Sequence, residues 1–214
     1  MNPKAVLFDC DGVIVDSEAA RIDLMCKDFS RYGLDVSAAE LEEISLGGTI
    51  WEAAEWAIGL GARLPDNWGR DFYTRLYALL ENGVELVPGI LTLLDRLDAA
   101  GVPYAVCSNG ELAKMDITLG QHGLSERFAP HVYSGQALGR VKPEPDLFLH
   151  AAAQLGIAPA DCAVVEDSAT GARAARRAGM HCMGYAPHGD GASLTAQGAV
   201  LFDDMGTLFA SLVN

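Results

Sequence analysis

The sequence has few of the features that mark membrane or secreted proteins. No stretch approaches the roughly 20 uninterrupted apolar residues of a membrane-spanning helix, although half of the 214 residues are hydrophobic. The residues before the first expected strand also lack the basic and then apolar pattern of a secretion signal. We therefore expect a cytoplasmic protein with no membrane partner, long enough for one large core or for a core with a small second domain.

Positive charge is also scarce. Lys and Arg number 15 against 29 Asp and Glu, which gives a formal net charge of −14. Because nucleic-acid binding requires a basic surface, this balance argues against a nucleic-acid partner. It also means that an anionic substrate has to be captured by a few local cations.

Cysteine is rare and not arranged in pairs. The five cysteines are an odd number, with no C-x-x-C and no metal-ligand spacing, so we expect reduced thiols and no disulfide framework. Cys10 lies between two aspartates, where a reactive thiol is one interpretation. Cys107 ends an expected strand and is expected to belong to the core.

The most informative segment that is present is a pair of aspartates near the start of the chain. Asp9 and Asp11 follow the apolar run of residues 5–8, which reads as a parallel strand buried on both faces. In open α/β sheets, ligands bind beyond the carboxyl ends of such strands. Paired oxygen ligands suit Mg²⁺, which completes its shell with water and a substrate phosphate. For such a pair alone, a turn with two solvated aspartates is the alternative.

Three later segments also place polar residues at or near the ends of expected strands. Each is weak alone, because small polar residues are common in turns. The residues concerned are Ser108 and Asn109 after residues 102–107, Lys142 in a loop braced by two prolines, and Glu166 and Asp167 after residues 162–165.

In this order, the four segments resemble the motifs of the haloacid dehalogenase-like phosphohydrolases: an Asp-x-Asp pair, a Ser or Thr, a Lys and a terminal acidic pair. The residues that flank Asp11, Lys142 and Asp167 resemble those of the branch that contains β-phosphoglucomutases and sugar-phosphate phosphatases, and the segments around Ser108 and Ser134 resemble 6-phosphogluconate phosphatase-type members. The resemblance implies that Asp9 is a nucleophile that forms an aspartyl phosphate and that Asp11 is the general acid and base.

The resemblance also implies a ligand set for phosphate and metal. Ser108, Asn109 and Lys142 would bind the phosphate. Mg²⁺ would be held by Asp9, by the backbone carbonyl of Asp11 and by an acidic residue of the last pair. That residue is expected to be Asp167, with Glu166 adjacent.

Strand-like patterns are missing from residues 17–84, where the hydrophobic periodicity is helical. Ser17 is a candidate N-cap for the first helix, and Thr49 with Glu52 forms a capping-box pattern for another. We expect this segment to be a separate all-helical domain. The resemblance implies that it is a cap inserted over the active site.

Residues 1–16 and 85–214 show an alternation of strand-like and helical patterns. Strands separated by helical segments predict a parallel sheet with right-handed crossovers. The expected fold is therefore α/β, with a Rossmann-like parallel sheet as the catalytic core. The expected strands cover residues 5–8, 104–107, 131–134, 162–165, 181–185 and 199–202.

The resemblance assigns substrate choice to a glycine-containing turn of the cap. Gly47 and Gly48 form the matching turn here, and a plain connection between helices is the alternative. Ile50 stands where β-phosphoglucomutases carry an Arg for a second phosphate, and Arg21 stands where they carry a His. Ile50 cannot bind phosphate, which favours hydrolysis. Arg21 is expected to be a solvated helix residue, with a clamp for a substrate carboxylate as the alternative.

The expected function is a Mg²⁺-dependent phosphatase that hydrolyses small phosphate monoesters, namely sugar or sugar-acid phosphates, through an aspartyl phosphate. A phosphomutase of the β-phosphoglucomutase type is the alternative, and a non-catalytic protein that binds phosphorylated metabolites is a further one. The expected partner is a small phosphorylated metabolite, and the expected assembly is a monomer or a weak dimer.

Overall fold

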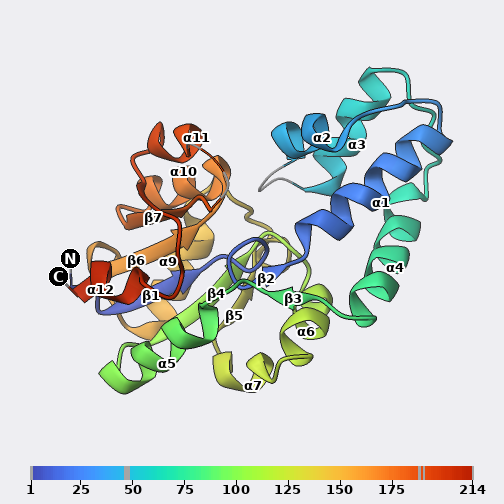
Figure 1. Cartoon of the computed structure of the whole chain (residues 1–214). Helices are drawn as coiled ribbons and strands as arrows, with labels where there is room; N and C mark the ends of the chain where they lie inside the picture. Colours follow the sequence, from blue (N-terminus) through green and yellow to red (C-terminus); the bar gives the residue numbers. More distant parts are fainter. Residues whose placement is uncertain (1, 46–48, 188, 190, 214) are drawn as a thin grey trace.

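A six-stranded parallel sheet forms the centre of the chain (Figure 1). The computed structural model describes residues 2–45, 49–187, 189 and 191–213. Every residue of β1, β4 and β6 is buried, as expected for a parallel sheet covered on both faces. In their order across the sheet, the strands are β5 (Val132–Ser134), β4 (Tyr104–Ser108), β1 (Ala5–Phe8), β6 (Cys162–Glu166), β7 (His181–Tyr185) and β8 (Val200–Phe202).

Alternate residues of β1 face two separate hydrophobic cores, because successive side chains of a strand point to opposite faces. Val6 and Phe8 pack in one core with α5 (Ile90–Ala100), α6 (Leu112–Gly120), α7 (Leu124–Phe128) and α12 (Leu208–Val213). Ala5 and Leu7 pack in the other with α9 (Asp146–Leu155), α10 (Ala169–Arg177) and α11 (Ala192–Thr195). The remaining elements of this part are α8 (Gly135–Leu138) and the 3-10 turn η1 (Pro159–Asp161).

Four further helices lie together beside the sheet and form what we call the helical block (Figure 1). The buried carboxylate of Asp28 joins the first helix of the block to its last: it accepts hydrogen bonds from the indole nitrogen of Trp68 at 2.9 Å and from the guanidinium of Arg75 at 2.5 Å. The helices are α1 (Glu18–Arg31), α2 (Ala38–Ser45), α3 (Ile50–Gly59) and α4 (Trp68–Glu81).

The helical block is connected to the sheet through a small antiparallel ribbon. Its strands are β2 (Val15–Asp16) and β3 (Glu85–Leu86), in which Asp16 pairs with Glu85. Neither strand is among those expected from the sequence, because two-residue strands are too short to show an alternating pattern. The ribbon brings the two ends of the helical block side by side.

Of the two helix N-caps predicted from the sequence, one forms its cap hydrogen bonds and the other does not. The capping box of α3 is confirmed: the hydroxyl of Thr49 accepts from the amide of Glu52 at 3.3 Å, and the Glu52 carboxylate accepts from the amide of Thr49 at 2.7 Å. Ser17 stands at the N-cap position of α1, but its hydroxyl donates to Asp11 and makes no cap hydrogen bond. Among the described residues, no helix is both long and apolar enough to cross a membrane.

Candidate active site

One cavity lies where the carboxyl ends of β1, β4 and β6 meet the helical block. It brings together every site residue proposed from the sequence and described in the structure, apart from Glu166; Gly47 and Gly48 lie outside the described residues. The sheet side supplies Asp9, Asp11, Ser108, Asn109, Gly110, Lys114, Gln136, Lys142, Asp167 and Ser168, and the helical block supplies Glu18, Arg21, Thr49, Ile50, Tyr73 and Leu76.

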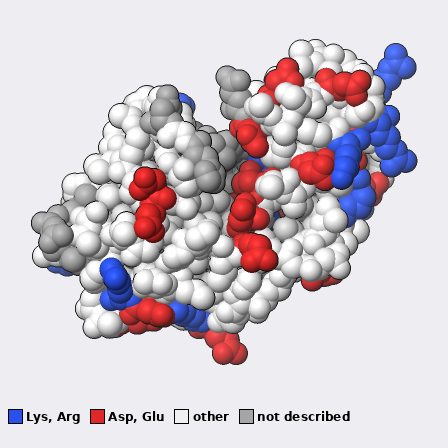
Figure 2. Space-filling model, viewed as in Figure 1, with Lys and Arg blue, Asp and Glu red and all other residues white. Residues whose placement is uncertain are grey.

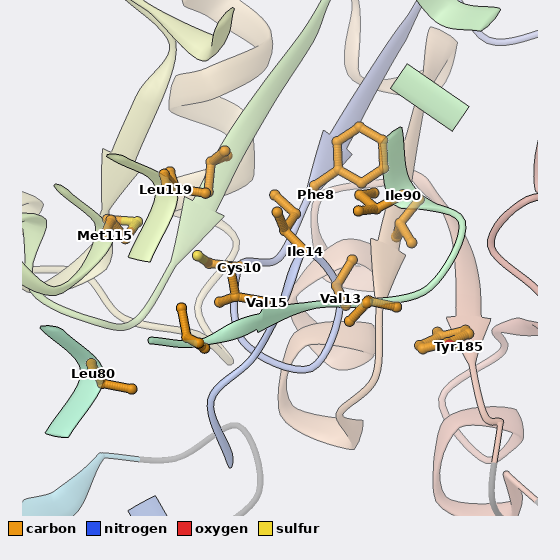
Figure 3. Packing of buried hydrophobic residues seen from close by; sticks show 14 of the residues in the cluster. Phe8, Cys10, Val13, Ile14, Val15, Leu80, Ile90, Met115, Leu119 and Tyr185 are labelled. Atoms are coloured by element: carbon orange, nitrogen blue, oxygen red, sulfur yellow. The ribbon is translucent and has the colours of Figure 1, made fainter. Parts of the chain in front are cut away.

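The turn after β1 is anchored from both sides. The side chains of Val13, Ile14 and Val15 enter the same core as Phe8, directly beyond the turn (Figure 3). Gly12 sits at the apex with a φ of +75°, a conformation that favours glycine. A Cβ at Gly12 would lie 1.9 Å from a carboxylate oxygen of Asp167, so only glycine lets the two motifs approach so closely.

Lys142 links Asp9 to Glu166. Its ammonium donates to the Asp9 carboxylate at 2.7 Å and to the Glu166 carboxylate at 2.5 Å, and all three side chains are buried. Burial raises the pKa of Asp9 from 3.8 to about 7, the charges of Glu166 and Asp11 add to the rise, and the Lys142 ammonium opposes it. Burial disfavours the charged form of Lys142, but Asp9 and Glu166 outweigh it and raise the Lys142 pKa, so Lys142 is a permanent cation.

The acidic cluster fits a divalent metal. Oxygen atoms of Asp9, Glu166 and Asp167 lie within 4.8 Å of one another, and carboxylate oxygens are the ligands that Mg²⁺ takes. Burial raises the pKa of Asp167 well above its usual value, and the charges of Asp9 and Glu166 raise it further. Three carboxylates face the single ammonium group of Lys142. A divalent cation would therefore balance the charge of this cluster.

Glu166 is the most enclosed of the three carboxylates. It is fully buried, and besides Lys142 it accepts from the hydroxyl of Ser168 at 2.8 Å and from the amide of Ser168 at 3.2 Å. It does not line the cavity. These contacts fix its carboxylate behind Lys142, at the start of α10.

Asp11 has its own cation, which the sequence analysis missed. The Lys114 ammonium donates to Oδ1 of Asp11 at 2.6 Å, and the hydroxyl of Ser17 donates to the same oxygen. Oδ2 lies 3.5 Å from the hydroxyl of Ser108. Burial opposes ionisation of Asp11, but the Lys114 charge and these hydrogen bonds outweigh it and lower the Asp11 pKa. The available signal was a lysine on the buried stripe of a helix, next to Met115.

Asn109 fixes the loop that carries Lys142. Its side-chain carbonyl accepts from the backbone amide of Lys142 at 2.8 Å, and its side-chain amide donates to the backbone carbonyl of Lys142 at 3.2 Å. The hydroxyl of Ser108 accepts from the amide of Gly110 at 2.9 Å. Ser108 therefore helps to shape the turn after β4, while Asn109 fixes the backbone of Lys142.

A family model for haloacid dehalogenase-like hydrolases matches residues 3–179. The chain is a haloacid dehalogenase-like hydrolase. This hydrolase is similar to three curated proteins that share 30–34% of its residues in the matched regions. It matches the protein SUPPRESSOR OF QUENCHING 1, chloroplastic, of Arabidopsis thaliana at 31% identity, over 96% of this chain and 20% of that protein.

Two relatives carry phosphatase names. The hydrolase is 34% identical to the bifunctional riboflavin kinase/FMN phosphatase of Arabidopsis thaliana, over 82% of this chain and 46% of that protein. It is 30% identical to the 6-phosphogluconate phosphatase of Escherichia coli (strain K12), over 83% of this chain and 80% of that protein. The chain thus spans less than half the length of the first two relatives.

Solved structures share the whole architecture of this hydrolase. A haloacid dehalogenase-like protein from Agrobacterium tumefaciens matches with a TM-score of 0.88 and 34% identity, over 99% of this chain and 98% of that chain. A family hydrolase from Deinococcus radiodurans, solved with bound phosphate and sodium, matches with a TM-score of 0.79 and 34% identity, over 98% of this chain and 94% of that chain.

The structure overturns the expectation for Arg21 and disfavours the interpretation of Cys10 as a reactive thiol. Arg21 is not a solvated helix arginine: it is only 6% exposed, its guanidinium pairs with the Glu18 carboxylate, and it lines the cavity. Cys10 is not a reactive thiol. It packs in the hydrophobic core with Val15 (Figure 3), and burial raises its pKa well above the usual value, which disfavours the thiolate. Cys107 is buried, as expected.

Proposed function

We propose that this hydrolase is a Mg²⁺-dependent phosphatase for small phosphate monoesters, such as sugar or sugar-acid phosphates, that acts through an aspartyl phosphate. The observation that carries the proposal is the contrast between two carboxylates of one cavity. Asp9 lies in the acidic cluster beside Lys142, whereas Asp11 is held by Lys114 and Ser17. Family membership and the phosphatase names of two relatives support the same reaction class.

The reaction divides between the two aspartates. In the first step an oxygen of Asp9 attacks phosphorus, the bond from phosphorus to the leaving oxygen breaks, and Asp11 in its protonated form, which the second step of the previous turnover restores, gives that oxygen its proton. In the second step Asp11 takes a proton from water as the water oxygen attacks phosphorus. The bond between Asp9 and phosphorus then breaks and inorganic phosphate leaves. One carboxylate cannot be the nucleophile and the proton carrier at once, so both aspartates are required.

The other cavity residues supply charge and position. Lys142 neutralises the phosphoryl oxygens, and the hydroxyl of Ser108 lies where it can hydrogen-bond one of them. Asp9, Glu166 and Asp167 would hold Mg²⁺, with the backbone carbonyl of Asp11 as a further ligand. When bound, Mg²⁺ supplies charge stabilisation for the transferred phosphoryl group.

The helical block is proposed to act as the cap, with residues 17–84 as the cap domain and residues 1–16 and 85–214 as the catalytic core. Two cap–core hydrogen bonds support this role: Gln136 donates to Tyr73 at 3.4 Å, and Tyr77 donates to Glu111 at 2.5 Å. A cap that closes over the cavity excludes bulk water from the attack on phosphorus.

Hydrolysis is favoured over the mutase alternative by one cavity residue. Ile50 is buried and lines the cavity from the helical block, at the position where a mutase needs a cation for a second phosphate. A non-catalytic protein is disfavoured because the acidic residues and both lysines meet in one place.

The test is a panel of phosphorylated metabolites incubated with Mg²⁺ and assayed for phosphate release. We expect turnover of several sugar or sugar-acid phosphates, abolished by chelation of the metal. Asp9→Asn, which keeps the size of the side chain, should lower kcat by about a thousandfold or more, as loss of a nucleophile does, while a cooperative unfolding transition shows that the variant still folds. Full activity of Asp9→Asn would disprove the covalent mechanism, and interconversion of β-glucose 1-phosphate and glucose 6-phosphate at the rate of hydrolysis would favour the mutase.

A further inference from the structure

A second hollow adjoins the catalytic cavity and is not used by the proposed reaction. It lies between α3, α4 and the segment before α6, and we call it the aromatic groove. Three aromatic side chains dominate it, with charged residues of both signs beside them. Its defining residues are Trp51, Arg70, Tyr73, Thr74, Tyr77 and Glu111.

The three rings of the aromatic groove form a continuous series. The ring centroid of Tyr73 lies 6.5 Å from that of Trp51 and 5.6 Å from that of Tyr77. Tyr73 and Tyr77 are one helical turn apart on α4, which explains why their rings share a face. Trp51 is 49% exposed, so a large part of an indole surface is open to solvent. Tyr73 and Tyr77 are partly buried beside it.

Trp51 is held in a fixed position by Gly69. A Cβ at Gly69 would lie 2.1 Å from Cη2 and 2.2 Å from Cζ3 of the indole. Only a glycine on α4 therefore lets the ring rest on the helix backbone, although glycine is a poor helix former. The indole of Trp51 thus packs against the backbone of α4 and is still about half exposed.

The aromatic groove and the catalytic cavity share a wall. Tyr73 lines both of them. Two pairs of consecutive residues also lie across this boundary. Ile50 lines the cavity and Trp51 lines the groove, and likewise Gly110 lines the cavity and Glu111 lines the groove. The two hollows are therefore neighbours, with Tyr73 at their boundary, and the leaving group of a substrate with its phosphate at Asp9 would reach the groove by passing Tyr73.

We propose that the aromatic groove binds a planar heteroaromatic ring in the leaving group of the substrate, and that a nucleoside 5′-monophosphate is the simplest ester of this class. Planar bases stack on Trp and Tyr rings. Asp66, Asn67 and Arg70 stand at the rim with donors and acceptors for the edges of a base. This inference narrows the substrate class and rests on the proposed phosphatase function.

A matched pair of substrates tests the proposal. Adenosine 5′-monophosphate and ribose 5-phosphate carry the same phosphate on the same ribose carbon and differ in the base. We expect kcat/KM for the nucleotide to exceed that for the sugar phosphate by about tenfold or more, the effect of one stacked base. Trp51→Ala should bring this ratio close to one, and Trp51→Phe, which keeps a ring, should preserve most of it. Ile58→Ala removes an exposed side chain of the same helix outside the groove and should leave the ratio unchanged.

A binding measurement separates the two proposals. Adenosine has no phosphate, so its binding to the Mg²⁺-loaded protein by calorimetry does not depend on turnover. Binding that weakens in Trp51→Ala would support the groove even if no ester were hydrolysed, and that outcome would count against the phosphatase. Phosphate release with equal kcat/KM for the two substrates, or a ratio that Trp51→Ala does not change, would overturn the groove proposal and leave the phosphatase intact.

Discussion

Asp9 and Asp11 are two residues apart, yet each faces a different lysine. Lys142 shares its charge between Asp9 and Glu166, and Lys114 holds one oxygen of Asp11. Such buried pairs fix side chains, although burial costs much of the Coulomb energy that they gain. The lowered pKa of Asp11 suits the proposed role of Asp11 as a base in the hydrolysis of the aspartyl phosphate.

Lys114→Met tests this role at the scale of one residue. Methionine keeps the length of the chain and removes the charge, so Asp11 is less ionised and less fixed. We expect kcat to fall by about tenfold or more and the aspartyl phosphate to accumulate in rapid-quench experiments. Lys4→Met is the matched control, because Lys4 pairs with Asp161 on the exposed surface. An unchanged level of phosphoenzyme in Lys114→Met would rule out this role.

The acidic cluster predicts how pH and metal affect stability. Burial raises the pKa of Asp9 from 3.8 to about 7 in the metal-free protein. Between these values the folded chain binds more protons than the unfolded chain, so the Asp9 contribution to stability declines as pH rises through this window. Mg²⁺ binds the deprotonated carboxylates, so its stabilising effect should grow with pH.

Thermal unfolding in EDTA and in Mg²⁺ measures this linkage. We expect the rise in Tm caused by Mg²⁺ to be small near about pH 5 and several degrees near about pH 8. Asp167→Asn, which removes one proposed ligand, should reduce that rise. Equal shifts at both pH values would show that the cluster does not titrate with the metal.

Among the elements, the central strands could be predicted from the sequence because parallel strands buried on both faces are continuous apolar runs. All five strands expected after residue 100 are present. Short helices such as α8 and α11 carry too few residues for a period to show. In the site, the motif spacing predicted Asp9 and Asp11. Periodicity places Lys114 on a buried helix stripe, but it does not encode which carboxylate of a distant segment that lysine meets.

The start of α10 gives a prediction at the scale of an element. Gly171 lies inside this helix, where Gly→Ala usually stabilises by about 1 kcal/mol. Here a Cβ would lie 1.8 Å from a carboxylate oxygen of Glu166, so the sign reverses. We expect Gly171→Ala to lower the free energy of unfolding by about 2 kcal/mol or more.

Gly59→Ala is the control for that substitution. Gly59 ends α3, is exposed, and has nothing within 4 Å of an added Cβ. Gly59→Ala should leave the free energy of unfolding unchanged or raise it by up to about 1 kcal/mol. Urea unfolding of both variants measures these two effects. Similar free energies of unfolding for Gly171→Ala and Gly59→Ala would show that α10 can move away from Glu166.

For the whole molecule, the net charge of −14 opposes the approach of an anionic substrate. Acidic side chains gather between the helical block and the sheet on the face shown in Figure 2. The negative surface repels an anionic substrate at long range, whereas the buried lysines attract its phosphate only after it has entered the cavity. Salt screens the long-range repulsion more than the attraction inside the cavity, because a Debye length is about 10 Å at 0.1 M.

We therefore expect kcat/KM for a phosphate ester to rise by about twofold as ionic strength increases from about 10 mM to about 150 mM at constant Mg²⁺. The value of kcat, which does not include the encounter, should change little. Initial rates over a salt series measure both. A steady fall of kcat/KM with salt would show that the field at the entrance attracts anions instead.

The two-residue ribbon of β2 and β3 has a consequence for how such a chain can change. Because Asp16 and Glu85 are neighbours across the ribbon, everything between them leaves and re-enters the sheet domain at one point. The order of the six strands does not depend on what is inserted there. The proposed cap, residues 17–84, is thus a unit that recombination could exchange or lengthen without a new junction in the sheet, and substrate recognition by this cap could then diverge while the proposed catalytic core stays unchanged.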